Sequence, residues 1–114
     1  MPPDLKTATG RVAEARARLA HLPPNEASLR EIEDVLADGY ALALAGDAWL
    51  KRTERHLHEL IDAASQPPRA GDLRALATVR GNFQRALVAL RDELGHLRQE
   101  YSRVLGTCRI ASPE

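Results

Sequence analysis

The sequence predicts an all-α protein, a three-helix antiparallel bundle in which a short first helix packs on a long hairpin of two helices. Six of the seven prolines form three pairs that divide the chain, Ala and Leu together supply 36 of the 114 residues, and no alternating β-branched run is present. Proline is excluded from helix interiors, whereas Ala and Leu favour them. We therefore expect coiled-coil-like helices over about 4–22, 25–65 and 70–108, in one domain spanning 1–114.

Each proline pair is followed by a residue suited to cap a helix. Asp4, Asn25 and Asp72 carry short side chains whose oxygens accept hydrogen bonds from the free N–H groups of a first turn. Such short connections join antiparallel neighbours. At 1.5 Å per residue, the second and third helices are each roughly 55–60 Å long, and the first is about 28 Å long. The first helix is therefore too short to cover the hairpin.

Apolar and small residues recur every three and four positions in each segment, which predicts coiled-coil packing. In the second segment this core row is Leu29, Ile32, Leu36, Gly39, Ala43, Gly46, Leu50, Thr53, Leu57, Leu60 and Ala64. In the third it is Leu73, Leu76, Arg80, Phe83, Leu87, Leu90, Leu94, Leu97, Tyr101, Val104 and Cys108. The two rows mesh when paired residue numbers sum to about 133 or 140. In either register Gly39 and Gly46 face bulky side chains, so we interpret both as sites of close helix approach or of room for a large neighbour, with a hinge role as the alternative.

The distal half of the hairpin, from about residue 48 to residue 87, is predicted to lack cover. Folding the first helix back places Leu5 near Leu42, so this helix ends before Trp49. A contiguous apolar strip around a tryptophan typically marks an interface. We expect a partner to bind through Trp49, Arg52, His56, Val79 and Ala86. The alternative is a bent second helix, or a shifted first helix, that packs the indole within the chain.

Charge is balanced overall but unevenly distributed. The chain has 16 basic and 16 acidic residues, yet residues 48–87 hold seven basic and four acidic ones, which leaves +3 there and −3 elsewhere. Glu33 and Asp47 lie on the same side of the hairpin as Arg98 and Arg91, where flanking charges can pair and fix the register.

Arg80 is the one charged residue in the core row of the third segment. Its stem can lie along Leu76 and Phe83 while the guanidinium reaches Glu54 or solvent. It can also act, together with Gly39 and Gly46, in fixing register or assembly state, as single polar residues do in coiled coils.

No catalytic or metal-binding pattern is present. His56 and His58 are two residues apart and therefore point about 200° apart on a helix, and the pair His58 and Asp62 lacks a third ligand. Glu93 and His96 form a single Glu-x-x-His pair, which we interpret as belonging to a solvated face. We therefore expect no enzyme activity, no cofactor and no small-molecule substrate.

The single cysteine, Cys108, excludes a disulfide framework, and no apolar run is long enough to span a membrane. We interpret Cys108 as a small core residue, with an exposed redox thiol as the alternative. Because no basic-then-apolar leader begins the sequence, we expect a soluble cytoplasmic protein without a membrane partner.

The expected function is therefore a non-enzymatic helical interaction module: an adaptor, scaffold or small regulator. We expect it to form a homodimer through the distal half, or to bind another helical protein there. The alternative is a nucleic-acid-associated protein that uses the seven arginines of the third helix. The preference for Arg over Lys, 14 to 2, can equally reflect a GC-rich coding sequence.

Overall fold

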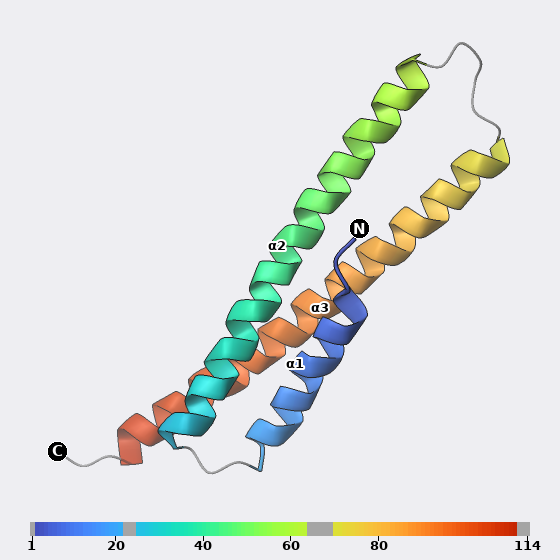
Figure 1. Ribbon diagram of the computed structural model, residues 1–114. Helices are drawn as coiled ribbons and strands as arrows, with labels where there is room; N and C mark the ends of the chain where they lie inside the picture. Colours follow the sequence, from blue (N-terminus) through green and yellow to red (C-terminus); the bar gives the residue numbers. More distant parts are fainter. Residues whose placement is uncertain (1, 22–24, 64–69, 112–114) are drawn as a thin grey trace.

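The computed structural model describes residues 2–21, 25–63 and 70–111, and in these ranges it describes the side chains except at 60, 63, 70–73 and 107–111. These residues form three helices and no strand: α1 Leu5–Leu19, α2 Glu26–Ala63 and α3 Ala70–Ala111. The two long helices run antiparallel, and α1 lies against the half of the hairpin remote from the tip (Figure 1). The molecule measures 73 × 20 × 18 Å. The predicted all-α architecture is confirmed.

Two of the three predicted caps are present. Asp4 accepts hydrogen bonds from the Thr7 side chain at 2.6 Å and from its backbone N–H at 3.1 Å, and these bonds hold the pKa of Asp4 below its usual value. Asn25 accepts one from the Ser28 N–H at 2.9 Å. The prediction for Asp72 is wrong, because α3 already begins at Ala70. Nothing after the proline pair prevents the backbone from entering a helix directly.

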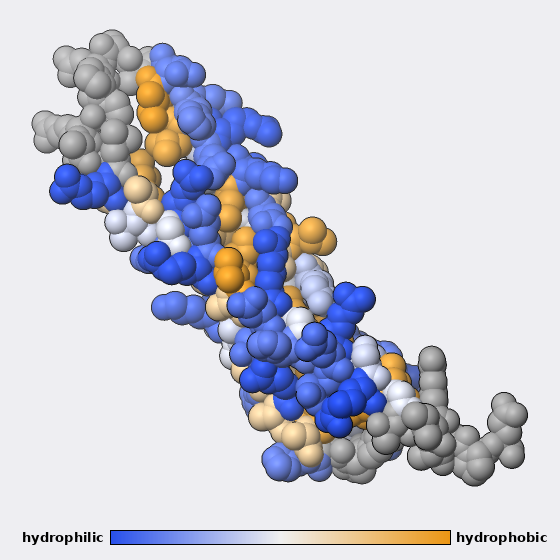
Figure 2. Space-filling view, turned by 180° about the vertical axis from the view of Figure 1, so that it is seen from behind, coloured by the Kyte–Doolittle hydropathy of each residue, from blue (hydrophilic) through white to orange (hydrophobic). Residues whose placement is uncertain are grey.

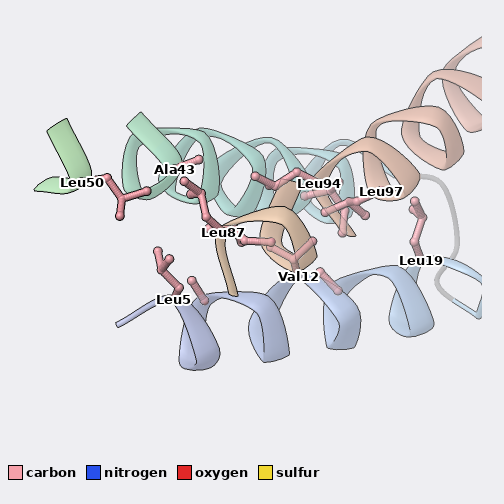
Figure 3. Close-up of a cluster of buried hydrophobic side chains, with 12 residues drawn as sticks. Leu5, Val12, Leu19, Ala43, Leu50, Leu87, Leu94 and Leu97 are labelled. Carbon is pink, nitrogen blue, oxygen red and sulfur yellow. The ribbon is translucent and has the colours of Figure 1, made fainter. Parts of the chain in front are cut away.

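The core occupies the proximal half, where three helices meet, and ends at its boundary with the distal half (Figure 3). α1 buries one side chain from every turn, and the most deeply buried residues of α3 are Leu90, Leu94 and Leu97, each 0% exposed. The complete buried apolar set is Leu5, Ala8, Val12, Ala15, Leu19, Ile32, Ala43, Leu50, Leu87, Leu90, Leu94 and Leu97. Leu50 and Leu87 are its last members toward the tip.

Two glycines of α2 fix how closely the long helices approach. A Cβ on Gly39 would lie 2.5 Å from Cδ2 of Leu94, and a Cβ on Gly46 would lie 3.1 Å from Cδ1 of Leu87. These contacts select the register in which paired numbers sum to about 133. Both glycines thus give room to a large neighbouring side chain, and a Cβ at Gly39 would force the Leu94 side chain to move.

Polar contacts along the flank of the hairpin agree with this register. Asp47 forms an ion pair with Arg91, as predicted. Glu33 instead accepts a hydrogen bond from the Tyr101 hydroxyl. That bond, together with burial and the nearby negative charge, raises the pKa of Tyr101 to about 12. The phenol therefore stays protonated, and able to donate, well above neutral pH.

Candidate functional site

Toward the tip from Leu50 and Leu87, the described part of the hairpin has no buried core. Among the side chains that the structure describes, none between 51 and 62 or between 74 and 86 is buried. Leu76 is 45% exposed and Val79 is 57% exposed. The prediction that Leu76 belongs to the core is wrong, because two helices alone shield one narrow stripe and α1 does not extend this far.

A groove between α2 and α3 follows this open stretch, and we call it the distal groove. Its floor is mainly apolar, and the ion pair between Glu54 and Arg80 lies at its edge. Its lining consists of Trp49, Leu50, Thr53, Glu54, Leu57, Leu76, Ala77, Val79 and Arg80. From behind, apolar side chains are visible between polar flanks in the distal half (Figure 2). The groove volume is about 130 Å³, well below the roughly 300–1,000 Å³ typical of small-molecule sites, so it suits protein side chains.

Trp49 lies at the boundary between the two halves. Its indole is half-buried against Phe83, with ring centroids 4.5 Å apart and planes tilted by 46°. Leu5 contacts the Gly46 position, which places the start of α1 about one turn nearer the tip than the predicted contact with Leu42. The indole is therefore neither fully exposed nor enclosed: one part packs within the chain, and another lines the distal groove.

The other predicted interface residues fall into two groups. Arg52, His56 and Val79 are exposed. Ala86 is half-buried and lines a shallow hollow beside Lys6 of α1. Ala86 therefore lies level with the first turn of α1, at the inner end of the uncovered stretch.

Arg80 leaves the core row as the sequence predicts. Its guanidinium pairs with Glu54, and its side chain is 48% exposed. The charge therefore reaches the rim of the distal groove while the stem contributes to its wall.

The solvated-face interpretation holds for His96, which is exposed, and is wrong for Glu93. Glu93 is half-buried, and its Oε2 lies 3.4 Å from Nη1 of Arg16. The same guanidinium nitrogen lies 2.9 Å from Nδ1 of His96. These contacts hold α1 against α3. Within the described part of the chain, no three His, Cys, Asp or Glu side chains are placed to share a metal ion.

Several arginines of α3 have partners. Arg91 pairs with Asp47 and Arg80 with Glu54 across the hairpin. Arg103 contacts Glu100 at 2.6 Å within the helix. These contacts reduce the positive charge available to phosphate groups. The side chains of Arg109 and Cys108 lie outside the described residues.

Sequence reasoning missed three exposed apolar side chains on the proximal and middle parts of the hairpin. Leu44 is 71% exposed, Val88 is 56% exposed and Tyr40 is 38% exposed. The sequence could have indicated them, since all three are large side chains at positions outside the core rows.

Comparisons with known proteins found no match: no family model, no curated protein and no solved structure matches this chain. Among the described residues, no helix has the length and apolar character needed to cross a bilayer.

Proposed function

We propose that this chain is a non-enzymatic helical interaction module that self-associates through the distal half of its α2–α3 hairpin. The observation that carries the proposal is the absence of buried side chains from the described parts of 51–62 and 74–86. Leu76 and Val79 nevertheless expose 45% and 57% of their surfaces there. Covering a Leu or Val completely is worth about 1.5–3 kcal/mol, so a partner gains part of this for each residue.

The distal groove indicates the type of partner surface. Its shape suits inserted side chains, and Trp49 offers an aromatic surface at one end. Aromatic anchors in apolar pockets contribute strongly to interface energy. Glu54 and Arg80 supply a polar rim, and Arg52 and His56 are exposed on the same helix as Glu54. A second helical hairpin would complete a four-helix arrangement around this groove.

Analytical ultracentrifugation of the full chain tests the proposal. The wild type should sediment as a dimer of about 25 kDa, twice the 12.5 kDa of one chain. Val79→Glu should shift the equilibrium to monomer by at least tenfold in Kd, because the interface would have to bury a carboxylate. Val79 is exposed in the monomer, so the substitution should leave the helices intact by circular dichroism.

Ala17→Glu is the matched control, since Ala17 is exposed on α1 and far from the tip. It should leave the dimer unchanged. A wild type that stays monomeric up to millimolar concentration contradicts self-association. Equal dimerisation of the wild type and Val79→Glu contradicts the distal location.

A further inference from the structure

The side of the hairpin that α1 covers in the proximal half stays uncovered in the distal half (Figure 1). Leu42 of α2 borders α1, and Trp49 and His56 follow it at intervals of seven residues. On α3, Ala86 lies beside the start of α1, and Val79 precedes it by seven residues. Because residues seven apart lie on one side of a helix, Trp49, His56 and Val79 continue the surface that α1 covers. We call this part of the distal half the open side.

Most of the positive charge of the distal half lies away from the open side. Among the described basic residues between 48 and 87, four are turned about 100° or more from the rows of Trp49 and Val79: Lys51, Arg55, Arg74 and Arg85. Arg80 is already paired with Glu54. The net charge of the distal half therefore does not face a partner that docks on the open side.

The open side itself carries one charge of each sign. Arg52 and Glu59 are both exposed on α2, seven residues apart and within about 80° of the row of Trp49 and His56. Within the described part of the chain, neither side chain has a hydrogen bond or an ion pair. An antiparallel second copy supplies both partners at once, because Arg52 then meets Glu59 in each direction, and such complementarity favours one orientation.

α1 restricts how a second copy can dock on this side. It lies against the proximal half and begins with Leu5 beside Gly46 (Figure 1). In a parallel dimer the two α1 helices would face each other and hold the distal grooves about 20 Å farther apart, since each helix is about 10 Å wide. An antiparallel copy avoids this obstruction, because its distal half occupies the space beyond the start of α1.

The length of the open side and its charges select the same register. The described side chains of α2 beyond the start of α1 run from Trp49 to Asp62, and this stretch overlaps an antiparallel copy of itself when opposing residue numbers sum to 111. Arg52 and Glu59 give the same sum. The overlap is about 21 Å long and 20 Å wide, or about 420 Å² in projection. Standard interfaces bury about 800 Å² per partner, so we expect a weak, reversible dimer.

We propose that two copies dock antiparallel through their open sides, with Arg52 of each copy paired to Glu59 of the other. The inference rests on the self-association proposed above. The interface is isologous, with its two-fold axis beside His56, so every contact occurs twice. The two α2 helices lie against each other, as do the two α3 helices. The result is a four-helix bundle in which all neighbouring helices are antiparallel, extended at each end by one α1.

Charge reversal tests the pairing by sedimentation equilibrium at low salt. Arg52→Glu and Glu59→Arg should each weaken the dimer by at least about fivefold in Kd, because like charges would then oppose each other twice. The double variant should recover the wild-type Kd, and so should a mixture of the two single variants. At about 1 M salt the losses should shrink, since exposed charges are screened. Arg55→Glu is the matched control, because Arg55 is exposed on another side of α2. It should leave the dimer unchanged.

The outcomes separate this inference from the proposed function. If Val79→Glu disrupts the dimer while charge reversal has no effect, or while the double variant fails to recover it, self-association through the distal half stands and the antiparallel pairing is overturned. A loss in Arg55→Glu equal to that in Arg52→Glu also overturns the pairing. If the wild type is monomeric up to millimolar concentration, both proposals are overturned.

Disulfide cross-linking locates the axis independently of charge. In a Cys108→Ser background, His56→Cys should form a cross-linked dimer under mild oxidation, because the two copies of this position meet beside the axis. His58→Cys is the matched control, since His58 is also exposed on α2 but is turned about 200° from His56. It should cross-link at least about tenfold more slowly. Equal or faster cross-linking at position 58, or none at position 56 in a protein that still dimerises, overturns the proposal.

Discussion

The proximal and distal halves of the hairpin are built from the same two helices with the same spacing of core positions, yet they differ in burial. Leu90, Leu94 and Leu97 are 0% exposed, whereas Leu76 is 45% exposed in the same row of α3. The difference is α1, which supplies a third wall along the proximal half only (Figure 1). A heptad pattern therefore determines which helices pair, while burial depends on how many helices surround the row.

Alanine substitution in each half gives the largest expected contrast. Leu94→Ala should lower the free energy of unfolding by about 2–5 kcal/mol, because it removes a fully buried side chain and leaves a cavity. Leu76→Ala should cost less than about 1 kcal/mol in the monomer, since much of that side chain is already in water. Urea unfolding, at a dilution where the chain is monomeric, measures both. Equal losses would show that the distal half has a core of its own.

The close approach of α2 and α3 can be tested through two glycines. Gly39→Ala places a Cβ 2.5 Å from Leu94, in a fully packed region. Overpacking costs about 1–3 kcal/mol, while replacing a helical glycine with alanine gains about 1 kcal/mol, so we expect a net loss of up to about 2 kcal/mol.

Gly10→Ala is the matched control for this substitution. Apart from its chain neighbours and the adjoining backbone of α1, no atom lies within 4 Å of a Cβ built there. It should therefore stabilise the protein by up to about 1 kcal/mol in the same urea assay. A Gly39→Ala variant as stable as Gly10→Ala would mean that the helices separate at no cost.

Local features of the fold could be predicted from the sequence, and features that depend on α1 could not. Asp4 and the glycine pair act through short-range rules, so the helix start and the two candidate registers follow from residue type and spacing. The choice between the registers required the Gly39–Leu94 contact. The links from Arg16 to α3 depend on where α1 sits along the groove, which composition and periodicity do not specify.

The candidate site was only partly predictable, because it too depends on where α1 lies along the hairpin. The uncovered stretch follows from helix lengths alone, and Val79 is exposed as that argument requires. The packing of Trp49 on Phe83 depends on α1 starting about one turn nearer the tip than the pattern indicates. Leu44 and Val88 were missed because periodicity singles out positions that repeat, and isolated apolar residues on a polar face do not repeat.

Arg80 provides a smaller test of the distal half. Arg80→Leu should raise the free energy of unfolding by up to about 1 kcal/mol, because Leu suits the core row and the half-exposed ion pair that it removes contributes little. Glu54 loses its partner but is 37% exposed and can be hydrated. The same variant should also form a mixture of assembly states by light scattering, if the charge restricts how copies dock.

Glu54→Gln controls for the ion pair itself, since it removes the carboxylate charge and keeps the arginine. We expect little change in assembly state from it. A single oligomeric species in Arg80→Leu, identical to that of the wild type, would count against a role for Arg80 in specifying assembly.

The smallest expected effect is in the proximal half, at the hydrogen bond from Tyr101 to Glu33. Because the folded-state pKa of Tyr101 is raised to about 12, above the usual value of 10, the bond stabilises the fold fully below pH 10 and ceases to do so as the pH rises through 12. Tyr101→Phe should therefore cost less than about 1 kcal/mol at pH 7, and the gap from wild type should close between pH 10 and 12. Urea unfolding of both proteins across this range measures the gap, and comparing the two cancels the deprotonation of Lys side chains. A gap that stays constant to pH 12 would show that the phenol proton contributes nothing to the pairing of α2 and α3.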